Sequence, residues 1–118
     1  MTTDSDTILK AQKQMQRCAK EIEAMANDMA DAMTVREFNS DRLKRAFSAS
    51  VVEFLDAGDS GVAAEHKSRA SKTYGAHLAD LQEQYKAAMR VIETYQGKQV
   101  MFSSAQSILA VERQKLGL

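Results

Sequence analysis

The stretch Ala57-Gly58-Asp59-Ser60-Gly61, near the middle of the chain, is the strongest turn signal in the sequence. Gly58 suits the position just after a helix C-terminus, where the backbone takes a left-handed conformation. Either Asp59 or Ser60 can cap the following helix by accepting hydrogen bonds from its first backbone N–H groups. We therefore expect a helix on each side of a turn at 58–61.

The two arms beside this turn, residues 5–57 and 62–116, are nearly equal in length and contain no proline. At the usual frequency of about 5%, about six prolines would be expected in a chain of this length. Proline interrupts helices, and the rest of the composition is poor in glycine and rich in good helix formers. The sequence predicts one all-α domain over 1–118, a long antiparallel helical hairpin of two to four helices with coiled-coil seams.

Apolar residues in the first arm follow the heptad spacing of a coiled coil. Two series, each with a period of seven, run side by side over about four heptads. They comprise Ile8, Met15, Ile22 and Met29, and Ala11, Cys18, Met25 and Ala32. This spacing predicts one continuous buried face along the first half of the arm.

A second seam follows alternating steps of four and three residues along the second arm. Its members are Tyr74, Leu78, Leu81, Tyr85, Ala88, Ile92, Tyr95, Gln99, Phe102, Gln106, Leu109, Arg113 and Leu116. Gly97 lies inside this run, but a helical glycine costs only about 1 kcal/mol relative to alanine and need not end the helix. Gln96-Gly97-Lys98 is nevertheless a candidate break.

A weaker sign of a helix break lies within the first arm, at residues 34–37. Thr34-Val35-Arg36-Glu37 has the form of a capping box, in which the Thr34 hydroxyl and the Glu37 carboxylate satisfy each other's backbone N–H groups. The heptad spacing also changes after this point. Two outcomes stay open: a kink at 33–35 between two helices, or one helix across the whole arm.

Narrow seams bury little apolar area, so the helices need further neighbours. The chain can fold back on itself as a three- or four-helix bundle, or hairpins can associate. The long second arm favours a homo-oligomer. The residues expected to pack in its helix seams are Ile8, Met15, Ile22, Met25, Met29, Leu78, Leu81, Tyr85, Ile92, Phe102 and Leu109.

The residue types of catalytic and metal sites do not cluster in this sequence. His66 and His77 are eleven positions apart on one helix, about 16 Å at 1.5 Å per residue, too far to share a metal ion. The single cysteine, Cys18, falls in the first seam, where a small buried side chain is expected. We expect no catalytic residue, no metal site, no cofactor and no small-molecule substrate, so the chain is not expected to be an enzyme.

The same composition bears on the compartment and on membranes. One cysteine cannot form an intramolecular disulfide, which favours a reducing cytoplasm. The first residues are polar and acidic, unlike a signal peptide, and the apolar runs are far shorter than the roughly 20 residues needed to span a bilayer. We expect a cytoplasmic protein without membrane contact.

Basic side chains concentrate in two segments, 36–50 and 66–77, although the formal net charge of the chain is +0. A hairpin that turns near 59–60 would bring these segments side by side, where phosphate contacts could concentrate. A solvated face with ion pairs inside each helix would give the same pattern. The candidate phosphate or partner contacts are Arg36, Arg42, Lys44, Arg45, Lys67, Arg69 and Lys72.

The segment from Ala64 to Tyr74, AEHKSRASKTY, and the heptad-spaced Leu78, Leu81, Tyr85 and Ala88 carry a resemblance. Over 63–110 the chain resembles small phage- and prophage-encoded helical coiled-coil accessory proteins found near recombination or replication functions. The shared pattern is a basic, alanine-rich start, an Arg-Ala-Ser-x-x-Tyr step and a coiled coil. Members commonly carry a tryptophan in the late helix, which this chain lacks. The resemblance implies an accessory role near DNA processing in the host cytoplasm and carries over no catalytic residue.

Two functions are therefore expected. The leading one is a non-enzymatic phage-type accessory protein that engages DNA or a DNA-processing protein through a helical surface. The alternative is a structural or chaperone-like coiled-coil adaptor that binds only a protein partner. Salt-dependent DNA binding would favour the first, and an exposed apolar, Met-rich groove would favour the second.

Overall fold

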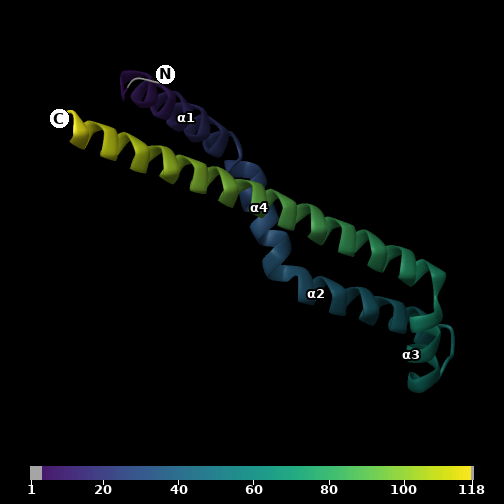
Figure 1. Cartoon of the computed structure of the whole chain (residues 1–118). Helices are drawn as coiled ribbons and strands as arrows, with labels where there is room; N and C mark the ends of the chain where they lie inside the picture. Colours follow the sequence, from purple (N-terminus) through teal and green to yellow (C-terminus); the bar gives the residue numbers. More distant parts are fainter. Residues whose placement is uncertain (1–3, 118) are drawn as a thin grey trace. The chain divides into compact units, whose positions relative to one another are not determined.

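The computed structural model describes residues 4–117, which form four helices and no strand (Figure 1). The helices are α1 (Asp4–Ala24), α2 (Ala26–Asp56), α3 (Gly61–Ala70) and α4 (Lys72–Lys115). The prediction of an all-α chain with two to four helices is confirmed. The chain divides into two compact units, one formed by the residues up to Ala30 with those from Arg90 onward, the other by residues 31–89.

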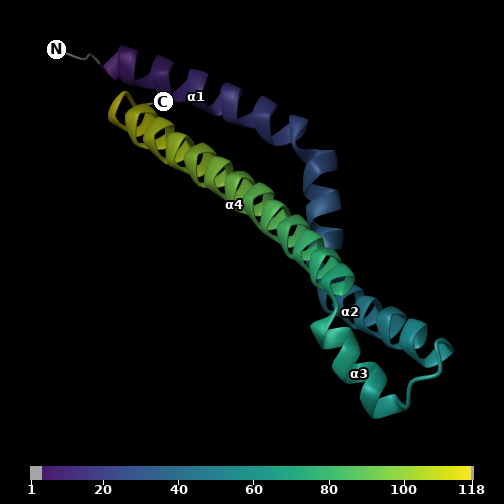
Figure 2. The same ribbon diagram turned by 90° about the vertical axis from the view of Figure 1, so that its right-hand side faces the viewer.

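In the first unit, α1 lies antiparallel beside the C-terminal part of α4 (Figures 1 and 2). Ala11 and Cys18 of α1 are buried against this part of α4, whose own buried apolar residues are Ile92, Ala105 and Leu109. All eight residues of the heptad seam expected in the first arm are buried or half-buried. The 3.5-residue period of that arm therefore marks the face that packs.

One salt bridge joins α1 and α4 at the edge of their interface. Lys98 Nζ donates to Glu21 Oε2 at 2.6 Å. This hydrogen bond, assisted by the positive charges of Lys98 and Arg17, holds the pKa of the Glu21 carboxyl below its ordinary value. Nearby, Gln14 Nε2 donates to the Met101 carbonyl oxygen at 3.4 Å. Both contacts fix the antiparallel register of α1 and α4.

The buried face of α4 follows the expected seam as far as Tyr95. Beyond it, the expected seam residues Phe102 and Leu109 stay half-buried and buried, but the positions between them move by one residue. The expected seam positions Gln99, Gln106 and Arg113 are exposed, and so is Leu116. The buried or half-buried positions in their place are Lys98, Ala105 and Glu112. The step from Tyr95 to Lys98 is an inserted three-residue step, a stammer. It replaces a buried glutamine by Ala105 and puts the Lys98 ammonium beside Glu21, but it also buries Glu112, whose Oε2 has no hydrogen-bond partner among the described residues.

The interruption in the first arm lies at Met25, and α2 runs unbroken across residues 33–35. The Met25 N–H points to both the Glu21 carbonyl at 3.1 Å and the Ile22 carbonyl at 3.2 Å, a three-centre pattern common at helix ends. The Met25 carbonyl in turn accepts from Met29 at 2.8 Å. The capping-box pattern at Thr34 therefore lies inside a helix.

In the second unit, α2 ends in the turn expected from the sequence. Gly58 has φ +99°. Its N–H donates to the Leu55 carbonyl at 3.0 Å, and the Asp59 N–H donates to the Phe54 carbonyl at 3.1 Å. This pair of bonds is a Schellman motif with Gly58 at C′. Of the two capping candidates, Ser60 caps α3, accepting from the Ala63 N–H at 3.3 Å.

Replacing Gly58 with alanine is expected to lower the free energy of unfolding by about 1–2 kcal/mol, because a Cβ disfavours this positive φ. A Cβ there would meet no atom within 4 Å, so the whole effect is conformational. Gly61→Ala is the matched control, since Gly61 lies in equally open space without a positive φ. Urea unfolding followed by circular dichroism measures both variants, and equal midpoints would contradict this account.

α3 packs on α2 through a narrow face of small residues. Ala64 and Ser68, one turn apart, are both 0% exposed. The Ser68 hydroxyl is satisfied by Ser50 of α2, whose Oγ donates to it at 2.9 Å. A short helix with few apolar side chains is thus held close to α2.

A break in the second arm, not expected from the sequence, lies at Ser71 rather than Gly97. The Ser71 N–H donates to the Ser68 carbonyl at 3.1 Å and ends α3. Its hydroxyl oxygen accepts from the Tyr74 N–H at 3.3 Å and caps α4. α4 then continues through Gly97 to Lys115. One serine therefore serves both helices.

Candidate functional site

A groove lies between α2 and the first turns of α4 in the second unit. It has a volume of about 320 Å³. The side chains that line it are Arg42, Arg45, Ala46, Ala49, His77 and Leu81. No carboxylate is among these lining residues, which provide two guanidinium groups, one imidazole and apolar side chains.

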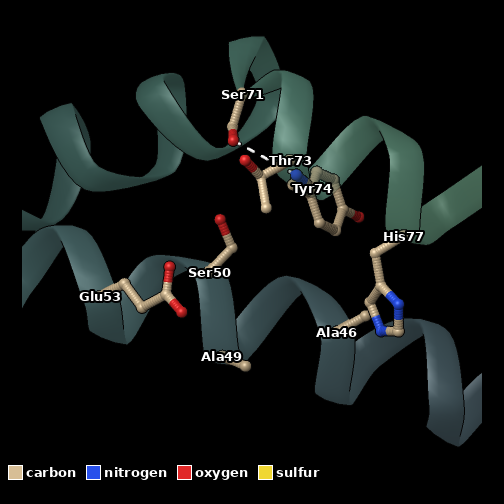
Figure 3. Close-up of a pocket in the computed structure, with 8 residues that line it drawn as sticks. All are labelled: Ala46, Ala49, Ser50, Glu53, Ser71, Thr73, Tyr74 and His77. Atoms are coloured by element: carbon tan, nitrogen blue, oxygen red, sulfur yellow. Dashed lines mark hydrogen bonds between the residues drawn. The ribbon is translucent and has the colours of Figure 1, made fainter.

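A smaller hollow of about 150 Å³ continues this groove toward the start of α4. The two cavities share Ala46, Ala49 and His77. In Figure 3, α2 forms one wall of the hollow and the start of α4 forms the other. The residues that line only the smaller hollow are Ser50, Glu53, Ser71, Thr73 and Tyr74. This hollow is rich in hydroxyl groups and contains Glu53, the only carboxylate among the residues that line the two cavities.

Helical spacing places the two arginines together. Arg42 and Arg45 are three positions apart on α2, so they occupy the same side of that helix. Arg42 donates from its guanidinium to Oε1 of Gln84 on α4, which fixes it over the groove. Ala46 and Ala49 are small and leave the floor of the groove open. The guanidinium groups of Arg42 and Arg45 and the imidazole of His77 thus line one groove from two helices.

Arg69, on α3, lies over Phe47 of α2. Its guanidinium carbon is 5.3 Å from the centre of the Phe47 ring. Phe47 also meets Tyr74 edge to face, with ring centres 5.8 Å apart. At 3.6 residues per turn, Phe47 is about 140° around α2 from Arg42. Arg69 is not among the residues that line the groove or the hollow.

The other candidate cations are dispersed. Lys67 pairs with Asp59 at 2.7 Å beside the turn. Arg36, Lys44 and Lys72 are exposed and, like Arg45, form no ion pair within residues 4–117. Lys44 is about 200° around α2 from Arg42. Of the seven basic residues predicted as contacts, the fold brings only Arg42 and Arg45 into one groove.

Sequence reasoning missed two members of this site. No binding role is expected from the sequence for His77, which is exposed, or for Gln84. His77, Leu81 and Gln84 have the i, i+4, i+7 spacing of one helix face. That spacing would have placed His77 and Gln84 on the side of α4 that meets Arg42.

The described part of the chain offers little else for chemistry. Cys18 is 0% exposed in the first unit. No three histidine, cysteine or acidic side chains of this part come close enough together to hold a metal ion. None of its helices combines the length and the apolar character needed to cross a bilayer. The groove beside Arg42 and Arg45, which combines two guanidinium groups with apolar side chains, is therefore the candidate binding site.

Comparisons with known proteins give no relative from which to transfer a role. No family model matches the chain, and no curated protein and no solved structure matches it.

Proposed function

We propose that the chain is a non-enzymatic binding protein that engages DNA phosphates through the groove between α2 and α4. The observation that carries this proposal is the lining of the groove, with two guanidinium groups, one imidazole and no carboxylate. A guanidinium presents a planar fork of donors that matches two phosphate oxygens at once. Because Arg45 has no ion pair within residues 4–117, a phosphate need not displace a carboxylate from it.

Further cations on the second unit would add contacts that do not depend on sequence. Arg36, Lys44 and Lys72 are exposed and unpaired by any carboxylate of residues 4–117. Each phosphate neutralised by such a side chain releases bound counterions, which makes affinity depend on salt. The resemblance of 63–110 to phage accessory proteins favours DNA, or a protein that processes it, as the setting. The proposal is a backbone-reading protein without catalysis.

The expected result for Arg42→Gln/Arg45→Gln is a loss of affinity for a fluorescent 20-base-pair duplex of about 10- to 100-fold at 50 mM salt. The slope of log K against log salt should also fall by about 2, since two phosphate contacts disappear. Fluorescence anisotropy over a salt series measures both. The control is Lys13→Gln/Lys20→Gln, which removes the same charge from exposed positions of α1 in the first unit.

Two outcomes would count against this proposal. Absence of binding by the unaltered protein at 50 mM salt would remove direct DNA contact. Equal losses in the groove variant and in the Lys13→Gln/Lys20→Gln control would mean that only overall charge matters. A steep salt dependence confined to the unaltered protein and the control would support the groove.

One observation favours the alternative, a coiled-coil adaptor. Phe38, Val52 and Leu55 on α2 are 48%, 51% and 43% exposed. Phe38 and Val52 are two heptads apart, so they lie on the same side of the helix and could meet a partner helix. An adaptor of this kind would show no DNA binding at 50 mM salt, so the same anisotropy titration separates the two functions.

A further inference from the structure

A face of α4 beside its seam with α1 exposes large apolar side chains, and Ile108 at the edge of this face also lines a groove with residues of α1. Val100, Met101, Ile108 and Val111 are 65%, 42%, 44% and 50% exposed. All four belong to the first unit and lie within about three turns of one helix. The neighbouring seam positions Ala105 and Leu109, which face α1, are buried. Exposed apolar side chains concentrated on one helix are typical of a surface that packs against another chain.

The sequence of this face is self-complementary about Ser104. Glu93 and Lys115 are eleven residues before and after Ser104, Gly97 and Val111 are seven, and Val100 and Ile108 are four. At 3.6 residues per turn, all of them fall within about 40° of the direction of Ser104. The spacing therefore places an acid and a base at opposite ends of one stripe, with apolar and small residues between them.

We propose that α4 pairs antiparallel with α4 of a second copy, about a twofold axis beside Ser104. In such a pair, each residue opposes the residue at the same distance on the other side of Ser104. Glu93 then faces the partner's Lys115, and Val100 faces the partner's Ile108. Each contact occurs twice, because a twofold interface uses the same patch on both copies.

Charge complementarity identifies a second copy as the occupant. Glu93 is exposed and forms no ion pair within residues 4–117. The Lys115 side chain is 58% exposed, and its one contact, Glu112 Oε1 at 3.3 Å, leaves further ammonium hydrogens for a second carboxylate. An antiparallel copy satisfies both ends, whereas a parallel copy in register would place Glu93 against Glu93.

Gly97 supports the same arrangement. A glycine inside a helix is destabilising relative to alanine, and here its φ is not positive. A Cβ on Gly97 would meet no atom of this chain within 4 Å, so the fold of one copy does not require a glycine there. In the antiparallel pair Gly97 lies opposite the partner's Val111 and gives that side chain room to pack. This inference does not depend on DNA binding.

Charge reversal at the two ends tests the pairing. Sedimentation velocity is expected to show the unaltered protein at twice the 13.1 kDa chain mass at 100 µM. Glu93→Lys or Lys115→Glu alone should weaken the dimer about tenfold or more, since each change creates two like-charge contacts. The double variant Glu93→Lys/Lys115→Glu should restore the dimer. A double variant no better than either single variant would overturn the antiparallel pairing.

A second pair of variants tests the apolar part of the face. Val100→Glu/Val111→Glu should give a 13.1 kDa monomer with unchanged helix content by circular dichroism. The matched control is Met33→Glu/Val62→Glu, two apolar residues of the second unit that are 39% and 69% exposed. The control should remain dimeric. A monomeric unaltered protein at 100 µM, a dimeric face variant or a monomeric control would each overturn the proposal.

Discussion

Replacing Ile92 with alanine is expected to lower the free energy of unfolding by about 3 kcal/mol. Ile92 is 2% exposed and is among the largest fully buried side chains of the described residues, the others being Cys18 and Ser68. Most other buried apolar residues are alanines, which have no longer side chain to swing into the space. The cavity left by the removed atoms would therefore stay largely open, and its cost would add to the lost transfer free energy.

Urea unfolding followed at 222 nm measures this loss, at one fixed protein concentration because association also stabilises a folded chain. Ile92→Val should fall in between, at about 1 kcal/mol. Val62→Ala is the control, since Val62 is 69% exposed and its truncation should change stability by no more than about 0.5 kcal/mol. An Ile92→Ala variant as stable as Val62→Ala would show that α4 does not pack through this face.

The sequence alone predicts the helices and the packing face of α1 well, because both depend on local signals. The period of seven from Ile8 to Ala32 needs no knowledge of the partner helix, since any partner must cover an apolar stripe. Gly58 is equally local: its positive φ follows from the chain having to leave a helix without a Cβ in the way. Both features were therefore predictable.

The helix breaks were less predictable, because several sites can end a helix at similar cost. Thr34 has a better capping motif than Met25, yet α2 is continuous at Thr34. Ser71 ends one helix and starts another with two bonds, and Ser-x-x-Tyr is not a pattern that demands a break. Tertiary packing decides among such sites, and a sequence does not display it.

The seam shift at Lys98 has a related cause. A regular heptad points to Gln99 as the next seam residue, but the pairing of Lys98 with Glu21 at 2.6 Å involves residues 77 apart in sequence. The same limit applies to the basic residues. Arg42 and Arg69 come from the two basic segments that are expected from the sequence to lie side by side, but their side chains have different partners. Arg42 donates to Gln84, whereas Arg69 lies over the Phe47 ring.

Replacing Phe47 with alanine is expected to lower the free energy of unfolding by about 3 kcal/mol, at the lower end for a phenylalanine because the ring is half-buried. Phe47 joins all three helices of the second unit. Its ring meets Tyr74 of α4 edge to face at 5.8 Å, and the guanidinium of Arg69 of α3 lies 5.3 Å from its centre. Truncation removes both interactions together with the buried apolar area.

A double-mutant cycle separates these terms. Arg69→Met keeps much of the aliphatic length and removes the cation, so its coupling with Phe47→Leu reports the cation–π contact, expected at about 0.5–1 kcal/mol. Tyr74→Phe is the control, because it keeps the edge-to-face ring contact and should leave the effect of Phe47→Leu unchanged. Urea midpoints of the four cycle members supply the coupling. Zero coupling between Phe47 and Arg69 would mean that α3 is held by the small-residue face at Ala64 and Ser68 alone, and Arg69 would then be free to join Arg36 and Lys44 in binding phosphate.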